Sequence, residues 1–341
     1  MKKIAVDCRY LGMSGIGRFL EGILQNLNFL EYDFYLIGKK ENVVKYKNCN
    51  YIFDYTNPFS IKGNFNCKLK NKINKMDVFF SPNFLIPFGV KIKTIITLHD
   101  VLFLDMPSVN KNKIETLEKK LLIKKNLKKS SQVLTISKFS YDRICYYFPN
   151  VKKKILFFYQ GVEKKFVNFP HCSNKEDYIV YVGNVKKQKG LSTLIEASKM
   201  IDLDVVIIGD KDGFKNKDLS LDFDINKNVR FTGKVSDKEL LEIVSRAKFL
   251  IQPSLYEGFG IPPLEALFLG TRPIISDIDV FLEIYSDLPV VFFKKNNAMD
   301  LAEKIKSSDY VFSFDKHKTL EKFNYCNFTN ALYNYFENKV K

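Results

Sequence analysis

The stretch 248–270 constrains the fold of this chain more than any other. Its apolar first part, 248–252, predicts a buried strand of a parallel sheet. Gly258 and Gly260 then predict a tight turn, and the two prolines that follow are tolerated in a first helical turn because their missing N–H would lack a helical partner anyway. A helix is expected from about 262 to 269, ended by the next glycine. This unit presents backbone N–H groups at the carboxyl edge of a sheet, where anionic ligands bind.

Two carboxylates belong to the same stretch. Glu257 lies in the expected turn and Glu265 in the expected helix. Carboxylates accept hydrogen bonds from sugar hydroxyls, whereas N–H groups suit a diphosphate. Together these groups favour a nucleotide sugar as the ligand. The alternative is an ordinary strand–helix turn with two exposed glutamates, since short glycine motifs often recur without function.

The motif as a whole resembles a known family. Glu257-Gly-Phe-Gly-Ile-Pro-Pro-Leu-Glu265-Ala, followed by Gly270-Thr-Arg-Pro-Ile-Ile-Ser-Asp277, is similar to the E-x7-E region of the family 4 retaining glycosyltransferases of the GT-B fold. The resemblance implies that Glu257 and the adjacent turn amides hold the donor sugar and that Glu265 holds the ribose. The donor-binding residues it implies in this stretch are Gly258, Phe259, Gly260, Ile261 and Glu265, with Glu257 as a catalytic residue beside the sugar.

Strands and helices alternate along the rest of the chain, which predicts an α/β protein with mostly parallel sheets covered by helices on both faces. We expect an N-terminal domain over 1–168 and a second domain over 175–315. Residues 316–341 are expected to form a C-terminal helix that packs back on the first domain. The resemblance implies GT-B architecture, in which two doubly wound, Rossmann-like domains face each other across a cleft, the first binding the acceptor and the second the donor.

Two further segments of the N-terminal half match the family. Gly15, Gly17 and Arg18 are expected in a glycine-rich loop that opens a helix. A dinucleotide fingerprint is excluded because its third glycine and acidic partner are missing. A plain tight turn is the alternative. His99 and Asp100 directly follow an apolar strand. A lone histidine is often structural, but the resemblance implies that the loop binds the donor and that His99 and Asp100 are catalytic, His99 contacting the sugar or the reaction centre.

A basic loop opens the second domain. The family usually carries an Arg-Lys pair at its end; here Lys189 matches the lysine, but the preceding position is Gln188. Lys189 is therefore the expected phosphate-binding cation, with Lys186 or Lys187 as candidates to compensate for the missing arginine. A solvated lysine turn is the alternative.

The net charge of +16 indicates an anionic partner. No nucleic-acid signature accompanies it, so we expect no nucleic-acid partner, although steeply salt-dependent DNA or RNA binding would reverse this. Between residues 110 and 130, eight lysines interleave with apolar residues at helical spacing, which predicts a basic amphipathic helix. Its function would be attraction to an anionic membrane surface, and a solvated helix face is the alternative.

No metal or other cofactor is expected. Asp222-Phe-Asp224 and Asp277-Ile-Asp279 each spell D-x-D, but their surroundings indicate a surface turn and a strand-end loop. Six scattered cysteines without a C-x-x-C pair indicate buried thiols in a reducing compartment. Without a secretory leader or a span of ~20 apolar residues, the sequence favours a cytoplasmic protein, with a peripheral position at the inner face of the cytoplasmic membrane as a further expectation.

The resemblance as a whole implies a hexosyltransferase of bacterial surface polysaccharide or lipopolysaccharide synthesis. The expected donor is GDP-mannose, with a UDP-hexose as the main alternative. The expected acceptor is a hydroxyl of a glycan or of a lipid-linked oligosaccharide. A catalytically inactive sugar-nucleotide-binding protein is a second alternative, and it would retain Glu265 without needing His99.

Overall fold

The structure, a computed structural model, describes residues 1–170, 172, 174–209 and 228–339. It divides into two compact units: unit 1 comprises Met1–Gly161 and Asn324–Lys341, and unit 2 comprises Val162–Phe323. The sequence predicted the boundaries between the two units near residues 168 and 316. Both differ by a few residues because α8 (Lys164–Val167) packs near α11 (Ile261–Phe268) within unit 2, and the C-terminal segment forms two helices rather than one.

Unit 1 contains a parallel sheet with strand order β3-β2-β1-β4-β5-β6-β7. Its strands are β1 (Lys3–Asp7), β2 (Asp33–Gly38), β3 (Asn50–Phe53), β4 (Val78–Ser81), β5 (Lys93–Thr97), β6 (Gln132–Thr135) and β7 (Ile155–Phe157). Sequence reasoning did not predict β7, a short edge strand. Its helices are α1 (Ser14–Leu24), α2 (Lys40–Val43), α3 (Ile61–Asn64), α4 (Cys67–Ile73), α5 (Leu102–Asp105), α6 (Lys113–Lys129), α7 (Lys138–Tyr147) and α15 (Cys326–Lys339), with short 3-10 turns η1 (Cys8–Tyr10), η2 (Pro107–Val109) and η3 (Pro149–Val151).

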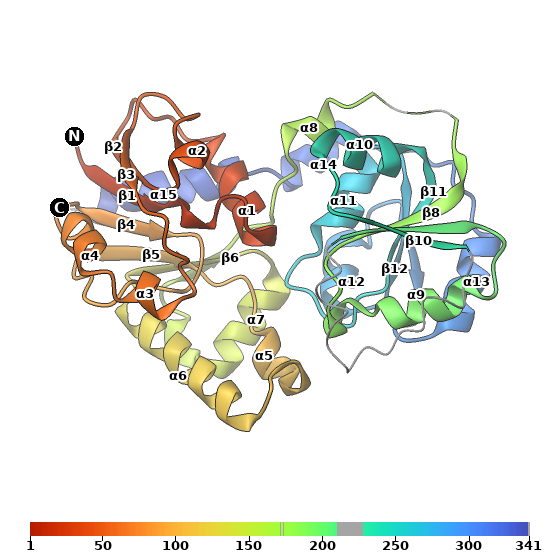
Figure 1. Ribbon diagram of the computed structural model, residues 1–341, viewed down its shortest axis with the longest axis horizontal. Coiled ribbons are helices and arrows are strands. Elements are labelled where there is room, and N and C mark those ends of the chain that lie inside the picture. The colour runs from red at the N-terminus through yellow and green to blue at the C-terminus, as the bar shows by residue number, and fades with distance from the viewer. Residues whose placement is uncertain (171, 173, 210–227, 340–341) are drawn as a thin grey trace. The chain divides into compact units, whose positions relative to one another are not determined.

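Helices cover both faces of this sheet (Figure 1). Apolar residues of α4, α6 and α7, among them Ile123 and Ile144, pack on one face in a single buried cluster. On the other face α1 meets α15, where the rings of Phe19 and Phe328 are 5.0 Å apart. The last helix of the chain therefore belongs to unit 1, as the sequence predicted.

Unit 2 repeats this architecture with a parallel sheet of order β10-β9-β8-β11-β12-β13. Its strands are β8 (Glu176–Val182), β9 (Asp204–Ile208), β10 (Val229–Gly233), β11 (Ala247–Gln252), β12 (Arg272–Ser276) and β13 (Val291–Phe293). Besides α8 and α11, its helices are α9 (Leu191–Ser198), α10 (Asp237–Arg246), α12 (Asp279–Tyr285), α13 (Ala298–Ser307) and α14 (Lys316–Lys322), with η4 (Lys187–Lys189). Helices α9 and α13 pack on one face, and α10 and α11 lie on the other (Figure 1).

Local sequence explains where several helices begin. The Ser236 and Glu239 side chains form a capping box at α10, and the Ser137 hydroxyl accepts a hydrogen bond from the backbone N–H of Ser140 at α7. The expected end of α11 is confirmed, since Gly270 has a φ of 75° directly after the helix.

The lysine-rich helix exists as α6, but the expected separation into one apolar and one basic face is wrong. The buried residues are Ile123, Asn126 and Leu127, whereas Leu117 and Leu121 are 56% and 55% exposed. Tertiary packing of Ile123 and Leu127 against the sheet decides which side of the helix faces inward. The exposed side of α6 consequently mixes lysines with aliphatic residues.

Candidate functional site

The carboxyl edge of the unit 2 sheet carries Lys189, Glu257 and the other donor-binding residues predicted in this unit. After β8 the chain forms η4, and after β11 it forms the glycine-rich turn. The backbone carbonyl of Gln188 accepts hydrogen bonds from the N–H groups of Leu255 and Tyr256, with N–O distances of 2.8 and 3.3 Å. Gln188 therefore joins the two loops through its backbone.

Lys189 and Glu257 meet at this junction. The Nζ atom of Lys189 lies 2.6 Å from Oε1 and 2.8 Å from Oε2 of Glu257. The Lys189 side chain is 22% exposed and that of Glu257 only 10%. A largely buried carboxylate needs such a partner, because an unpaired charge would be costly to remove from water. The expected phosphate-binding cation and the expected sugar-binding carboxylate thus form one ion pair.

Two polar residues that sequence reasoning missed orient Glu257. The hydroxyl of Ser254 donates to Glu257 Oε1 at 2.7 Å, and the amide of Gln252 donates to Ser254 Oγ at 2.9 Å. The backbone carbonyl of Ser254 in turn accepts a 2.5 Å hydrogen bond from the hydroxyl of Ser276, the last residue of β12. A signal for these residues exists in the sequence, since both Gln252 and Ser254 come directly at the end of an apolar strand.

The turn before α11 requires glycine at one position. Gly260 has a φ of 83°, and a Cβ there would lie 2.3 Å from a ring carbon of Phe281. Its carbonyl accepts a hydrogen bond from the Tyr285 hydroxyl. Phe259 is almost fully buried, so its aromatic ring serves the core of unit 2. Only its backbone remains for the predicted contact with a donor.

The N-terminus of α11 offers fewer N–H groups than expected. Pro262 and Pro263 carry none. Of the first four helical residues, Ile261 and Leu264 carry a backbone N–H. Glu265, one helical turn further on, is 4% exposed and therefore buried within the unit.

His99 follows β5 in unit 1, as predicted. Its Nε2 lies 2.8 Å from the carbonyl oxygen of Pro82, which can only accept, so the proton is on Nε2 and Nδ1 has a free lone pair. Burial lowers the pKa of His99 to about 4, against a smaller opposing effect of the Pro82 hydrogen bond. The imidazole is consequently neutral near pH 7. Asp100 accepts a 3.0 Å hydrogen bond from the N–H of Leu102 and helps to begin α5.

The glycine segment differs from the expectation, because α1 already begins at Ser14. Gly15, Gly17 and Arg18 therefore lie within the first two turns of a helix rather than in a loop. A Cβ at Gly17 would lie 2.5 Å from the carbonyl oxygen of Tyr10, whereas a Cβ at Gly15 would meet nothing within 4 Å. Packing alone accounts for the glycine at 17 and does not account for the one at 15.

Sequence reasoning also missed a buried ion pair at the carboxyl end of β1. Arg9 lies 2.7 Å from Asp7, and its guanidinium also donates to the carbonyl of Gly63 at 3.1 Å. Nothing in the local pattern distinguishes these charges from exposed ones.

The predicted site residues form two groups: Gly15, Gly17, Arg18, His99 and Asp100 in unit 1, and the remainder in unit 2.

The D-x-D segments and the cysteines have simple surroundings. Asp277 accepts a 2.7 Å hydrogen bond from the N–H of Lys295, while residues 222–224 lie outside the described part of the chain. Among the described residues, no three His, Cys, Asp or Glu side chains gather in a way that could hold a metal ion.

The cysteines are not all buried as expected: Cys8 is buried, but Cys67 and Cys326 are exposed. Within residues 1–209 and 228–339, as far as they are described, every helix is too short or too polar to span a bilayer.

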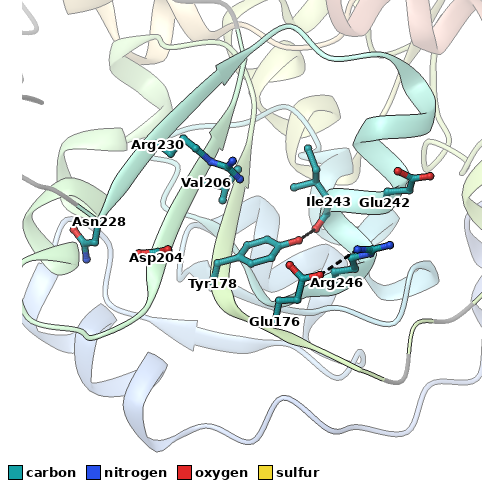
Figure 2. A pocket seen from close by; sticks show the side chains of 9 residues that line it. All are labelled: Glu176, Tyr178, Asp204, Val206, Asn228, Arg230, Glu242, Ile243 and Arg246. Carbon is teal, nitrogen blue, oxygen red and sulfur yellow. Dashed lines mark hydrogen bonds and ion pairs between the residues drawn. The ribbon is translucent and has the colours of Figure 1, made fainter.

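A cavity of about 510 Å³ lies elsewhere in unit 2, at the amino ends of β8, β9 and β10 (Figure 2). Several polar groups in its walls already form hydrogen bonds or ion pairs with each other. The Tyr178 hydroxyl donates to the carbonyl of Ile243 at 2.6 Å, and Arg246 pairs with Glu176 at 3.2 Å. Burial raises the pKa of Tyr178 to about 12. This cavity lies at the edge of the sheet opposite to Lys189 and Glu257.

Comparison with known proteins gives a family match within the second unit. The family described as "Glycosyl transferases group 1" matches residues 163–308. The O-antigen chain mannosyltransferase RfbU of Salmonella typhimurium is 31% identical over 196 residues, which are 56% of this chain and 54% of that protein. The O-antigen chain mannosyltransferase B of Escherichia coli is 23% identical over 63% of this chain and 60% of its own length. The matches thus span less than two thirds of each relative.

Solved structures agree over nearly the whole chain. A glycosyltransferase from Rickettsia africae superposes with a TM-score of 0.69 at 18% identity, covering 98% of both chains. Alr3699/HepE of Anabaena, solved in complex with UDP-glucose, gives a TM-score of 0.76 at 12% identity, covering 98% of this chain and 99% of that one. Likenesses at such identities concern the fold alone. They confirm the predicted α/β fold of the GT-B class.

Proposed function

Because residues 163–308 match the glycosyl transferases group 1 family, we propose that this protein is a retaining glycosyltransferase that uses a nucleotide sugar as its donor. The observation that carries the proposal is the ion pair between Lys189 and Glu257 at the carboxyl edge of the unit 2 sheet. This edge is where nucleotides bind in doubly wound folds. The buried Glu265 on the adjoining helix supplies a second acceptor for donor hydroxyls.

The proposed chemistry follows from the charges at this edge. Hexose transfer passes through an oxocarbenium-like centre beside a departing diphosphate. Lys189 would neutralise the leaving diphosphate, together with the N–H groups of the turn 258–261, and no metal ion is required in this account. Glu257, fixed by Ser254, would accept hydrogen bonds from sugar hydroxyls rather than attack the sugar. Stabilisation that grows as the leaving charge develops accelerates the reaction.

His99 fits a polar role near the reacting sugar, as the family resemblance implies. Its pKa of about 4 keeps the imidazole neutral, and its Nδ1 can accept a hydrogen bond. A neutral imidazole does not repel a cationic sugar centre, whereas an imidazolium would. Gly15 and Arg18 of α1 are proposed to contact the donor, and the absence of a packing reason for Gly15 supports this.

We propose mannose from GDP-mannose as the transferred group, and a hydroxyl of a glycan or lipid-linked glycan as the acceptor. Support comes from the O-antigen mannosyltransferases among the relatives. A UDP-hexose is the second candidate, which the fold likeness to a protein solved with UDP-glucose favours. The protein would act in the cytoplasm at an anionic membrane surface, which the exposed lysines of α6 support.

Release of free nucleotide from a panel of GDP- and UDP-sugars in the presence of EDTA tests the proposal. We expect release from one donor, insensitivity to EDTA, and loss of release in Glu265→Gln but not in Glu303→Gln, a change at an exposed position of α13. Release that requires a divalent cation would contradict the metal-free mechanism. Equal rates in the two variants would contradict the assigned site.

A further inference from the structure

A groove of about 700 Å³ lies in unit 1, between α6 and the segment that runs from the end of α7 through η3. No predicted site residue lines it. Its walls are mostly apolar and its rim is basic, and the lining residues are Lys120, Lys124, Leu127, Lys128, Tyr147, Phe148, Pro149, Asn150, Val151 and Lys154.

The basic rim is a stripe along one side of α6. Lys120, Lys124 and Lys128 are four residues apart, so their side chains follow each other on the same helical face. All three are exposed, and none forms an ion pair with any residue that the structure describes. Lys120 lies 5.9 Å above the ring of Tyr147. Like charges at this spacing repel each other, so the stripe does not stabilise the helix.

The apolar wall is held rigidly. Leu127, Phe148 and Val151 belong to the buried cluster of unit 1 and line the groove. The hydroxyl of Tyr147 donates to Asp105 at 2.9 Å, which fixes the ring at one side of the groove. The groove is therefore part of the folded unit, with walls set by core packing.

The fourth lysine of the rim has a different role. The Nζ of Lys154 donates to the backbone carbonyl of Leu127 at 2.5 Å and to that of Ser130. It thereby satisfies carbonyl groups at the C-terminal end of α6, which is a common function of lysine at this position. The cations that remain for a ligand are those of the stripe.

Exposed aliphatic residues continue the groove along α6. Ile114, Leu117 and Leu121 are 68%, 56% and 55% exposed. At 100° per residue they share the outward side of the helix with Lys124 and Lys128. A nucleic acid would use the lysines but not these side chains. A surface that offers phosphate groups above hydrocarbon uses both.

We propose that this groove binds an anionic phospholipid of a membrane surface. The phosphate headgroup would contact Lys124 and Lys128, and the first methylene groups of an acyl chain would lie against Phe148, Pro149 and Val151. The purpose of such a site rests on the proposed function, because a site on this surface would hold unit 1 where a lipid-linked acceptor is found. Its test needs neither donor nor acceptor.

The first experiment measures sedimentation with vesicles of phosphatidylcholine, with and without phosphatidylglycerol, using the full chain at low salt. The variant Lys120→Gln/Lys124→Gln/Lys128→Gln is compared with Lys199→Gln/Lys306→Gln/Lys318→Gln, which removes three exposed lysines from unit 2. Each lysine near an anionic surface contributes about fivefold, so we expect roughly 100-fold weaker binding for the groove variant. The control is expected to lose less than about threefold. Equal losses in the two variants, or no loss in either, would overturn the proposal.

The second experiment separates a lipid site from a site for phosphate alone. Monomeric dihexanoyl phosphatidylglycerol and glycerol phosphate are titrated against the protein, and binding is followed by calorimetry. Because acyl methylenes gain from burial, the acylated probe is expected to bind at least tenfold more tightly. Asn150→Glu adds a negative charge at an exposed position of the rim, so this variant should bind the acylated probe more weakly than the wild type does. Equal affinity of the two probes would contradict an acyl-chain site, and an unaffected Asn150→Glu variant would contradict a phosphate headgroup at this rim.

Failure of this inference is distinguishable from failure of the proposed function. The groove variant keeps every residue of the donor site, so its nucleotide-sugar affinity should equal that of the wild type. Normal donor binding without lipid binding by the wild type would refute the lipid site and leave the proposed transferase function standing. Lipid binding without donor binding would have the opposite meaning.

Discussion

The ammonium group of Lys189 lies within 2.8 Å of both carboxylate oxygens of Glu257, across 68 positions of sequence. This contact fixes the loop after β8 to the turn after β11. One charge of the pair is suited to a diphosphate and the other to sugar hydroxyls. The two halves of a nucleotide sugar would therefore be recognised by side chains that already position each other.

Replacing Glu257 by glutamine tests this relationship. Glutamine keeps the length of the side chain but removes the charge that pairs with Lys189. We expect kcat/KM to fall about 100-fold, since charge-assisted hydrogen bonds contribute up to ~3 kcal/mol. Glu303→Gln on α13 is the control and should leave the steady-state kinetics unchanged. A loss below threefold in Glu257→Gln would show that the carboxylate is not part of the site.

Ser254→Ala addresses the hydroxyl that orients Glu257. Loss of the 2.7 Å hydrogen bond should raise the donor Kd about five- to tenfold, corresponding to ~1 kcal/mol. Ser245→Ala is the matched control, because Ser245 is also buried in unit 2 but donates to a backbone carbonyl of α10 at 3.0 Å. Calorimetry of donor binding and thermal unfolding should be measured for both. Equal effects on donor binding would indicate a purely structural role.

The two glycines at the start of α1 should respond in opposite ways to alanine. Gly17→Ala places a Cβ 2.5 Å from the carbonyl oxygen of Tyr10 and should destabilise the protein by roughly 1–3 kcal/mol. Gly15→Ala meets no atom within 4 Å and should stabilise the helix by about 0.5–1 kcal/mol. Urea unfolding measures both. If Gly15 contacts the donor, Gly15→Ala will also raise the donor KM despite its greater stability; an unchanged KM would remove Gly15 from the donor site.

His99 should make stability depend on pH in a defined window. Its pKa of about 4 in the folded protein lies below the value of about 6.5 expected for the unfolded chain, so the unfolded chain binds more protons between these pH values. The free energy of unfolding should therefore fall by about 3 kcal/mol as the pH decreases from 6.5 to 4. Urea unfolding of wild type and His99→Gln across this range isolates the contribution. Parallel pH profiles would show that His99 is not held neutral.

The strand–turn–helix unit at 248–270 could be predicted because its signals are local. An apolar run, two glycines and two prolines determine β11, the turn and the start of α11 without help from distant residues. The pairing of Lys189 with Glu257 could not be predicted in this way, since it depends on neighbouring loops of the folded sheet. The family resemblance named both residues but did not indicate that they touch.

The helix α6 shows the limit of periodicity. Ile114, Leu117 and Leu121 have helical spacing, which predicted the helix but not its orientation. Packing of Ile123 against the sheet buries the other side and leaves these residues exposed. The start of α1 at Ser14 was missed for a related reason: glycines indicate a loop locally, whereas the close approach of Gly17 to Tyr10 requires a glycine within the helix.

The proposed donor site is best tested by calorimetric titration of GDP-mannose and UDP-glucose into the wild type, Glu257→Gln and Glu265→Gln. We predict saturable binding of one donor at one site per chain, GDP-mannose being the expected one. We also predict that each variant, shown to be folded by its thermal unfolding, binds that donor at least tenfold more weakly. Absence of binding of either nucleotide sugar to the wild type, or wild-type affinity in both variants, would contradict the proposed donor site.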